Sequence, residues 1–412
     1  MTNNTQTAAP AIELYKARDG LLLINGVPVT ALANRAGRTP FYAYDRALIV
    51  ARIKALRGVL PPSVDLHYAV KANPMPALVD YVAGLVDGLD VASAGEMEVA
   101  LQAGMAGSRI SFAGPGKTEA EIARAVAAGV TINVESEAQF RHVVRAGSAV
   151  GKRPRIAVRV NPDFALKSSG MQMGGGPQQF GVDSEKVPAL LKKIVAADVD
   201  LAGFHIFSGS QNLNAEAIIE TMTRAVDLAI ALAVPAGLRL DHVNIGGGLG
   251  IPYFPGEKPL NPAPIGKALA GLARKAKSEL AGARLVVELG RYIVGEAGVY
   301  ICRVLEKKIS RGETFLITDG GLHHHLAASG NFGQVLRRNY PVAVANRMGA
   351  PAGKPVNVVG PLCTPLDILG AKVALPAARA GDLIAVFQSG AYGLTASPTA
   401  FLSHAPPAEL LV

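Results

Sequence analysis

The chain has 412 residues and a mass of 42.7 kDa, well above the roughly 150 residues of an average domain, so a single small module is excluded. Half of the residues are hydrophobic and 18% are charged, which is typical of a folded globular protein and excludes a disordered or collagen-like chain. The two cysteines, Cys302 and Cys363, are too few for a disulfide framework. We therefore expect a reducing, cytoplasmic location, and residues 1–10 carry no signal-peptide pattern.

The formal net charge of +9 suggests an anionic ligand or a mildly basic enzyme surface. Nucleic acid is not expected as a partner, because the basic residues are scattered and aromatic residues make up only 5% of the chain, with no Trp. A membrane is not expected either. The most apolar helical stretch, 225–236, is interrupted by Asp227 and Pro235 and is shorter than the roughly 18 to 20 residues of a membrane span.

Short apolar runs alternate with helical segments through the middle of the chain, which predicts parallel strands joined by helices. The predicted helices include 76–86, 95–103 and 118–128. The predicted strands are 66–70, 89–92, 110–113, 131–134, 156–160, 202–207, 242–245 and 285–288. Eight such units indicate a (β/α)8 barrel of the TIM type over residues 45–289, with a doubly wound sheet as the rival fold. The stretch 167–181 is interpreted as an inserted active-site loop.

Beyond residue 290 the pattern changes to short strands separated by Gly, Pro and Asp, which predicts a β-sandwich or β-barrel domain. These strands are expected at 299–305, 314–318, 356–359 and 383–387. The N-terminal stretch 12–29 has Asn25-Gly26 as a hairpin turn. We expect residues 1–44 and 290–412 to form this second domain together.

Candidate catalytic groups lie where strands end, because a barrel of this type places its active site there. Lys71 follows the first strand, and burial at this place would lower the pKa of its amine and favour a Schiff base. Glycines 246–248 could hold a phosphate with backbone N–H groups, although their spacing does not match a dinucleotide motif. Glu288 and Arg291 supply a carboxylate and a cation on the same rim. A lysine, a phosphate cradle and a carboxylate are the groups that pyridoxal 5'-phosphate requires.

The chain resembles the fold-type III pyridoxal-phosphate decarboxylases, the group of diaminopimelate and ornithine decarboxylases. The segments that carry the resemblance are 68–74, 205–211, 246–253, 288–291, 360–363 and 390–393. They occur in colinear order over nearly the whole chain. The resemblance implies a barrel plus a β domain, an amino-acid substrate, and a homodimer in which each subunit completes the other's active site.

The resemblance also implies roles for individual residues. Lys71 would form the Schiff base, Glu288 would pair with the pyridine nitrogen, and Arg159 would lie near the phenolic oxygen. Cys363 of the neighbouring subunit would return a proton to Cα, whereas Cys302 is interpreted as a core residue. Further cofactor contacts are expected from Asp90, His205, Phe207, Ser210, Gly247, Gly248, Gly290, Arg291 and Tyr392. Substrate contacts are expected from Arg291, Tyr340, Thr364, Asp367 and Tyr392.

Two positions depart from the family pattern. Phe207 stands where the family stacks a histidine on the cofactor ring, so that either Phe207 or the preceding His205 could cover the ring. Thr364 stands where the family has the carboxylate that pairs with a distal ammonium group of the substrate, which disfavours a diamino acid. No metal is expected at His323–His325, because consecutive side chains of a strand point to opposite faces.

These departures make the chain most similar to the decarboxylases that act on an amino acid carried by an acyl carrier protein, and to those encoded with exosortase systems. The predicted function is therefore decarboxylation at Cα of an amino acid, of glutamyl type and tethered to a carrier. One alternative is a diaminopimelate, ornithine or arginine decarboxylase that acts on a free amino acid. The other is an inactive homologue with a regulatory role, which the presence of Lys71, Glu288, Arg291, Cys363 and Tyr392 disfavours.

Overall fold

The computed structural model describes residues 10–165, 171–172, 174–332, 334 and 337–412. By contacts, the chain divides into a β unit (1–51, 251–259 and 293–412) and a barrel unit (52–250 and 260–292). The segment 251–259 joins the β unit, although the sequence analysis assigned it to the barrel.

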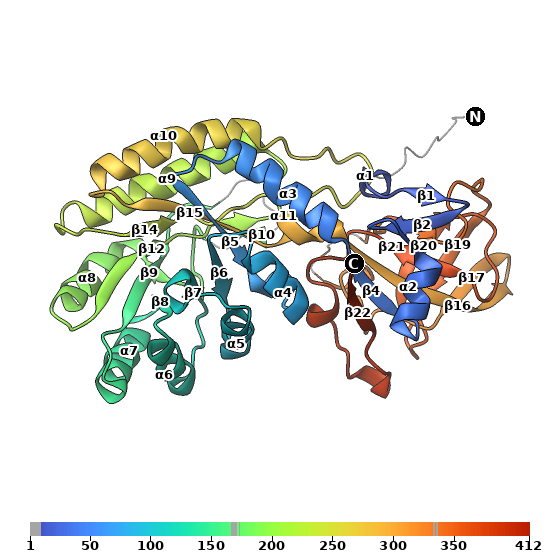
Figure 1. Cartoon of the computed structure of the whole chain (residues 1–412), viewed down its shortest axis with the longest axis horizontal. Helices are drawn as coiled ribbons and strands as arrows, with labels where there is room; N and C mark the ends of the chain where they lie inside the picture. The colour runs from blue at the N-terminus through green and yellow to red at the C-terminus, as the bar shows by residue number, and fades with distance from the viewer. Residues whose placement is uncertain (1–9, 166–170, 173, 333, 335–336) are drawn as a thin grey trace. The chain divides into compact units, whose positions relative to one another are not determined.

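Eight parallel strands close the barrel, as the sequence predicted (Figure 1). In order around the barrel they are β5 (Val64–Ala69), β6 (Gly88–Val91), β7 (Ile110–Phe112), β8 (Thr131–Val134), β9 (Arg155–Asn161), β12 (Asp200–His205), β14 (His242–Asn244) and β15 (Arg284–Leu289). Strand β15 pairs with β5, with Glu288 opposite His67, so the sheet has no free edge here. This closure excludes the rival doubly wound sheet.

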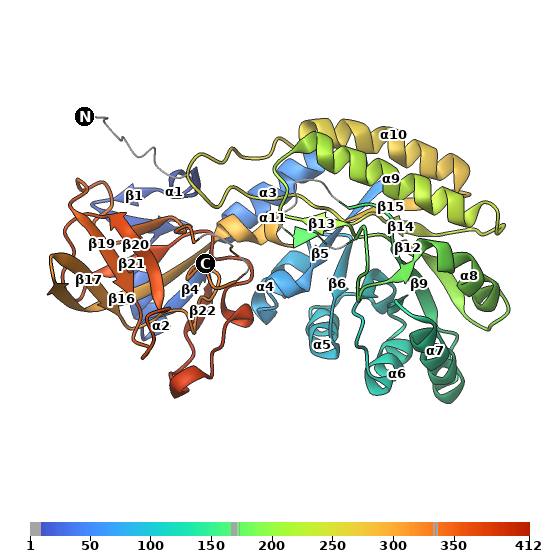
Figure 2. The same cartoon turned by 180° about the vertical axis from the view of Figure 1, so that it is seen from behind.

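Helices cover the outside of the barrel (Figures 1 and 2). They are α3 (Arg46–Val59), α4 (Pro76–Ala83), α5 (Ala94–Gln102), α6 (Glu119–Ala128), α7 (Glu137–Val150), α8 (Val187–Val195), α9 (Ala215–Ala233) and α10 (Ala263–Glu279), followed by the short α11 (Arg291–Val294). Local sequence fixes their ends. Thr118 and Glu121 form a capping box at the start of α6, and Gly129 ends the helix with φ +70°, where a residue with a Cβ would be strained.

Helix α9 contains most of the apolar stretch 225–236 and buries Val226 and Leu232 in the barrel unit. In the part of the chain that the structure describes, no helix is long and apolar enough to cross a membrane. The inserted stretch 167–181 lies partly outside the described residues. Its short strand β10 (Met171–Gln172) pairs with β13 (Gly209–Ser210), and β11 (Val182–Asp183) extends the sheet beside β9.

The β unit is organised around the long strand β16 (Gly298–Ser310). The other strands of its mixed sheet are β4 (Phe41–Tyr44), β17 (Glu313–Thr318), β18 (Val342–Val344), β19 (Pro355–Val359), β20 (Ile368–Ala374), β21 (Leu383–Val386) and β22 (Ala408–Leu411). The sequence predicted β16, β17, β19 and β21 but missed β4, β18, β20 and β22. Strand β4 reads Phe-Tyr-Ala-Tyr and is buried along its whole length, so it lacks the alternation that marks a half-exposed strand.

The N-terminal segment forms a small sheet of β1 (Ala17–Arg18), β2 (Leu21–Ile24) and β3 (Val27–Pro28), with the helices α1 (Pro10–Glu13) and α2 (Val29–Ala36) on either side in the sequence. The predicted turn at Asn25-Gly26 joins β2 to β3. Leu22 and Ile24 are fully buried in the same hydrophobic cluster as Phe41 and Val299. This cluster ties the N-terminal sheet to the core of the β unit.

Candidate active site

The carboxyl end of the barrel brings Lys71 to Glu288. Lys71 lies in a single 3₁₀ turn (Val70–Ala72) directly after β5, and Glu288 lies near the end of β15. The Lys71 Nζ donates a hydrogen bond to Glu288 Oε1 at 3.1 Å. The sequence analysis expected Lys71 to be buried, which is wrong: its side chain is 43% exposed, because the turn carries it past the strand end.

Glu288 connects Lys71 to His205. The second carboxylate oxygen, Oε2, lies 3.2 Å from His205 Nε2, and both side chains are only 4% exposed. Burial alone would raise the pKa of Glu288, but the charge of Lys71 and the contact with His205 lower the pKa well below its usual range. Glu288 is therefore an ionised carboxylate in a low-dielectric place, suited to hold a cation or a proton on a ligand.

Phe207 is the aromatic ring beside Lys71. The Lys71 Nζ lies 5.6 Å from the centroid of the half-buried Phe207 ring, within the range of a cation–π contact. The His205 ring lies 6.4 Å from the Phe207 ring and faces Glu288. The sequence offered both His205 and Phe207 as the side chain that covers the cofactor ring. The one next to the Lys71 amine is Phe207.

A small pocket lies at the ends of β12 and β14. Ser208, Gly209, Gly247 and Gly248 line it, and the buried Ser208 Oγ has no hydrogen-bond partner among the described residues. Gly247 allows a close backbone approach, since a Cβ there would lie 2.3 Å from the carbonyl oxygen of Glu288. The predicted Ser210 is half-buried in β13 and does not line this pocket.

Asp90, at the end of β6, is buried and lies 3.3 Å from His67 Nδ1. Burial lowers the pKa of His67, but Asp90 outweighs this effect and raises the pKa above its usual value. Gly290 packs so closely on the turn of Lys71 that a Cβ would lie 2.7 Å from the Ala72 Cβ. Arg291 begins α11 directly after it. Asp90, Gly290 and Arg291 share the carboxyl end of the barrel with Lys71.

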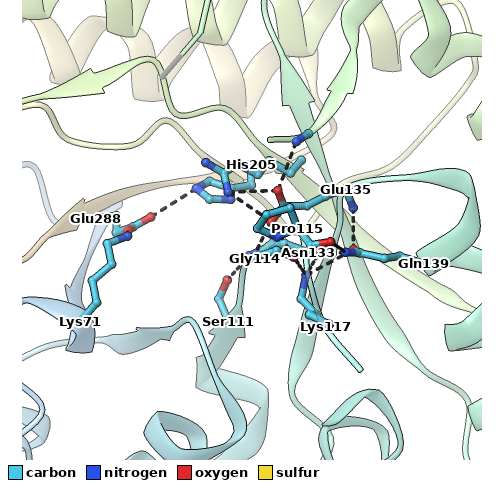
Figure 3. Close-up of polar contacts among 12 residues, drawn as sticks. Lys71, Ser111, Gly114, Pro115, Lys117, Asn133, Glu135, Gln139, His205 and Glu288 are labelled. Atoms are coloured by element: carbon cyan, nitrogen blue, oxygen red, sulfur yellow. Dashed lines mark hydrogen bonds and ion pairs between the residues drawn. The ribbon is translucent and has the colours of Figure 1, made fainter. Parts of the chain in front are cut away.

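A buried ionic cluster occupies the neighbouring strand ends (Figure 3). Arg159, on β9, donates from Nη1 to both carboxylate oxygens of Glu135, at 3.1 and 3.2 Å. Lys117 Nζ lies 3.9 Å from Glu135 Oε1. The sequence analysis missed Glu135 and Lys117, although Glu135 follows the predicted fourth strand directly and so occupies the same kind of position as Lys71 and Asn161.

The β unit holds the remaining predicted residues. Cys363 is exposed, whereas Cys302 is fully buried and burial raises the pKa of its thiol. Asp367 is only 2% exposed, because its two oxygens accept backbone N–H groups of Leu322 and Leu362.

Thr364, in the same loop, is half-buried, and its hydroxyl accepts a hydrogen bond from the N–H of Leu366. Tyr340 is buried against Tyr253, with ring centroids 4.9 Å apart. Tyr392 is half-buried and has φ +53°. Four of the five predicted substrate residues thus occur in the β unit with Cys363, at positions of different exposure.

His323, His324 and His325 lie in a turn rather than a strand, so the alternation used to argue against a metal does not apply to them. The N–H groups of His324 and His325 both donate to the carbonyl oxygen of Gly321. All three rings are buried, and burial lowers their pKa values to about 4, 3 and 3. Within the described ranges, no group of three side chains is arranged to hold a metal ion.

The barrel end has a chemically defined set of groups: an accessible amine, an ionised carboxylate beside it, an aromatic ring, and a pocket with an unpartnered hydroxyl. This set fits pyridoxal 5'-phosphate, whose aldehyde, pyridine nitrogen, ring face and phosphate need these four kinds of partner. Fold and site together define a barrel enzyme of the pyridoxal-phosphate class.

Residues 46–295 match the family described as pyridoxal-dependent decarboxylase, pyridoxal binding domain. The L-glutamyl-[BtrI acyl-carrier protein] decarboxylase of Niallia circulans is 38% identical over 93% of this chain and 90% of its own length. A diaminopimelate decarboxylase of Archaeoglobus fulgidus is 34% identical, with the same coverage. The diaminopimelate decarboxylase structure from M. jannaschii in complex with L-lysine superposes with a TM-score of 0.86 at 25% identity, over 98% of this chain and 93% of that chain. The chain belongs to the pyridoxal-dependent decarboxylase family and is a decarboxylase of amino-acid metabolism.

Proposed function

We propose that this enzyme removes the α-carboxylate of an amino acid of glutamyl type while that amino acid is attached to an acyl carrier protein. The observation that carries the proposal is the loop 360–367, which offers no free carboxylate to a substrate. The first support from similarity is the relative of 38% identity that acts on an L-glutamyl carrier protein. The net charge of +9 also suits an acidic partner protein.

The substrate argument starts from Thr364 and Asp367. Both oxygens of Asp367 are engaged by backbone N–H groups and the side chain is 2% exposed, so this carboxylate has no free face for a ligand. Thr364 contributes only a hydroxyl. A substrate ammonium group placed at this loop would lack a counter-charge, and leaving a charge buried without its partner costs several kcal/mol. A substrate with an uncharged distal end avoids this cost.

Pyridoxal phosphate supplies the electron-accepting ring for the electrons released when the Cα–carboxylate bond breaks. Lys71 would hold the cofactor through its amine. The pKa of Glu288 lies well below the usual range, so its carboxylate is ionised and would keep a proton on the pyridine nitrogen. Phe207 would cover one face of the ring. Ser208 and the N–H groups of Gly247 and Gly248 would bind the phosphate. The resemblance assigns the phenolic oxygen to Arg159.

Cys363 would then return a proton to Cα from the partner subunit of a homodimer. Its exposed position in the β unit leaves its thiol accessible to another chain. Mixing Lys71→Ala chains with Cys363→Ala chains tests this proposal. If sites are shared between subunits, one site of each mixed dimer contains both native residues, and activity returns to a fraction of the wild-type level. No recovery, with mixed dimers demonstrated, contradicts shared sites.

The substrate proposal is tested by mass spectrometry of the purified enzyme with pyridoxal phosphate and two sets of substrates. One set is an acyl carrier protein loaded with glutamate or related amino acids, and the other is a panel of free diaminopimelate, ornithine and arginine. We expect loss of carbon dioxide from the loaded carrier and none from the panel. Turnover of a free diamino acid alone supports the alternative decarboxylase, and no turnover with cofactor bound supports an inactive homologue.

A further inference from the structure

The strongest further feature is the buried cluster of Arg159, Glu135 and Lys117, which lies beside the proposed cofactor site. The charge of His205 contributes to the lowered pKa of Glu135, so Glu135 lies within electrostatic reach of the site. In Figure 3, His205 stands between Glu288 and Glu135. The resemblance assigns a role to Arg159 alone, and nothing assigns one to Glu135 or Lys117.

Glu135 is held from several sides. Besides Arg159, its carboxylate accepts the backbone N–H of Gly181 at 3.1 Å and that of Gly114. Burial alone would raise the pKa of Glu135, but Arg159 and Lys117 lower it below its usual value, so the carboxylate is ionised at neutral pH. A fully bonded, ionised carboxylate has little freedom, and it fixes the guanidinium that binds it.

Lys117 is the second cation close to the Glu135 carboxylate. Its side chain is 1% exposed, and Nζ donates to the carbonyl oxygens of Gly114 and Asn133, both at 2.7 Å, and to Gln139 Oε1 at 3.4 Å. Burial lowers the pKa of Lys117 to about 8, although Glu135 opposes this effect. Two cations thus share one carboxylate, and the cluster carries one positive charge in excess. An anionic oxygen of a ligand would balance that charge.

The second face of Arg159 is also fixed. The guanidinium carbon lies 4.8 Å from the centroid of the Phe180 ring, and the side chain is 7% exposed. Glu135 on one side and Phe180 on the other leave Arg159 little rotamer freedom, so its position does not depend on the ligand. A group pre-organised in this way binds an anion without an entropy cost at the moment of binding.

We infer that Glu135, supported by Lys117, is a positioning residue that fixes Arg159 against the phenolic oxygen of pyridoxal phosphate. The inference rests on the proposed function, because that function places the cofactor at this end of the barrel. Neither Glu135 nor Lys117 needs to touch the cofactor. Their effect is transmitted through the place and the charge of the Arg159 guanidinium.

The test uses three variants of the full chain and two readouts other than turnover. Glu135→Asp keeps the charge but shortens the side chain and so withdraws Arg159. Glu135→Gln combined with Lys117→Met removes one negative and one positive charge. The cluster therefore keeps its net charge of +1 but loses the carboxylate that holds Arg159. Glu119→Gln is the matched control, because Glu119 is 69% exposed and pairs with Arg145 and His142 on the outside of the barrel. Circular dichroism confirms that each variant folds.

The first readout is the affinity of the cofactor-free protein for pyridoxal phosphate, and the second is the pH at which the absorption band of the Lys71-bound cofactor changes. We expect Glu135→Asp and the double variant to weaken cofactor binding about tenfold, the scale of one charge-assisted hydrogen bond. We also expect both to raise the pH of the spectral change, because a withdrawn cation no longer disfavours the protonated form. Glu119→Gln should match the wild type in both readouts.

Wild-type affinity and a wild-type spectral pH dependence in both folded Glu135 variants overturn the inference while leaving the proposed function intact. A loss confined to Glu135→Asp, with the double variant unchanged, also overturns it, because Arg159 would then bind the cofactor normally in a variant that lacks the Glu135 carboxylate altogether. If the wild-type chain itself binds no pyridoxal phosphate, the proposed function fails, and the inference fails with it.

Discussion

The two ends of the barrel differ in how far their polar side chains are paired. At the amino ends of the strands, each carboxylate is matched by an arginine: Arg284 donates to Asp65 at 2.5 and 2.9 Å, and Arg155 lies 2.6 Å from Asp241. At the carboxyl ends, Ser208 Oγ and His205 Nδ1 are buried without hydrogen-bond partners among the described residues. Buried polar atoms that are left unpaired cost stability, so they indicate a place where a ligand completes the bonding.

Cavity size alone would have pointed to the wrong end. A cavity of about 310 Å³ lies at the amino ends, lined among others by Asp65, Arg155, His242 and Arg284. Its charges are already paired, whereas the smaller pocket at Ser208 has an unpartnered hydroxyl and three glycines. The comparison teaches that unsatisfied polar groups, rather than empty volume, distinguish the proposed cofactor end of this barrel from the opposite end.

The largest expected effect is that of Lys71→Ala. Loss of the amine removes the covalent link to the cofactor, so the visible absorption band should disappear and turnover should fall by roughly 10⁶-fold, as for removal of a catalytic nucleophile. Absorption spectra and carbon dioxide release measure both effects. Lys186→Ala, at a lysine that is 70% exposed, is the control and should leave both unchanged. An unchanged spectrum in Lys71→Ala would sink the assignment.

Glu288→Gln should have the next largest effect. The amide cannot stabilise a proton on the pyridine nitrogen as the ionised carboxylate does, so turnover should fall by about a hundredfold or more, the scale of a lost electrostatic contact in a dry site. The cofactor should remain attached to Lys71. Asp65→Asn makes the same chemical change at the other end of the barrel. Equal losses of activity in the two variants would break the distinction between the ends.

Arg284→Ala should affect stability alone. The pair with Asp65 is half-exposed, with the Arg284 side chain 47% exposed, so its loss should lower the free energy of unfolding by about 0.5 to 1 kcal/mol. Urea unfolding measures this difference, and turnover at a permissive temperature should be unchanged. A large loss of turnover in the folded variant would mean that the amino end takes part in the chemistry.

His67 lies between the two ends, since it lines the cavity and contacts Asp90. Its pKa is raised in the folded protein, so the stability it contributes is fully present below its unfolded pKa of about 6.5 and is lost as the pH rises through the folded value. We therefore expect the stability difference between the cofactor-free wild type and His67→Gln to shrink as the pH increases from 6 to 8. A difference that grows over this range contradicts the proposed ion pair.

Most of the fold could be predicted because the barrel strands are short apolar runs that end at Gly, Ser or Asn. Strand β8 (Thr131–Val134) was predicted to the residue, since Gly129 lies just before it and a glutamate follows it. Strand β22 was missed. It pairs with β4, which joins residues 408–411 to residues 41–44, and a local sequence pattern cannot predict a partner so far away in the chain.

The site was predictable where a residue lies at the end of a strand or directly after it and matches a known motif, as Glu288 and Lys71 do. Lys117 was not, because it precedes the helix cap Thr118 and looks like a solvated loop charge until the oxygens of Gly114, Asn133 and Gln139 surround it. The hydrogen bonds that occupy both Asp367 oxygens were not predictable for the same reason: one partner, Leu322, lies 45 residues before Asp367, and the other, Leu362, lies 5 residues before it.

The central claim is that the carboxyl end of the barrel holds pyridoxal phosphate through Lys71. The most direct measurement is borohydride reduction of the enzyme with its cofactor, followed by peptide mapping with mass spectrometry. Reduction converts an imine into a stable secondary amine, so a pyridoxyl group should be found on the peptide that contains Lys71. A pyridoxyl group on another lysine, or on none, would contradict the account.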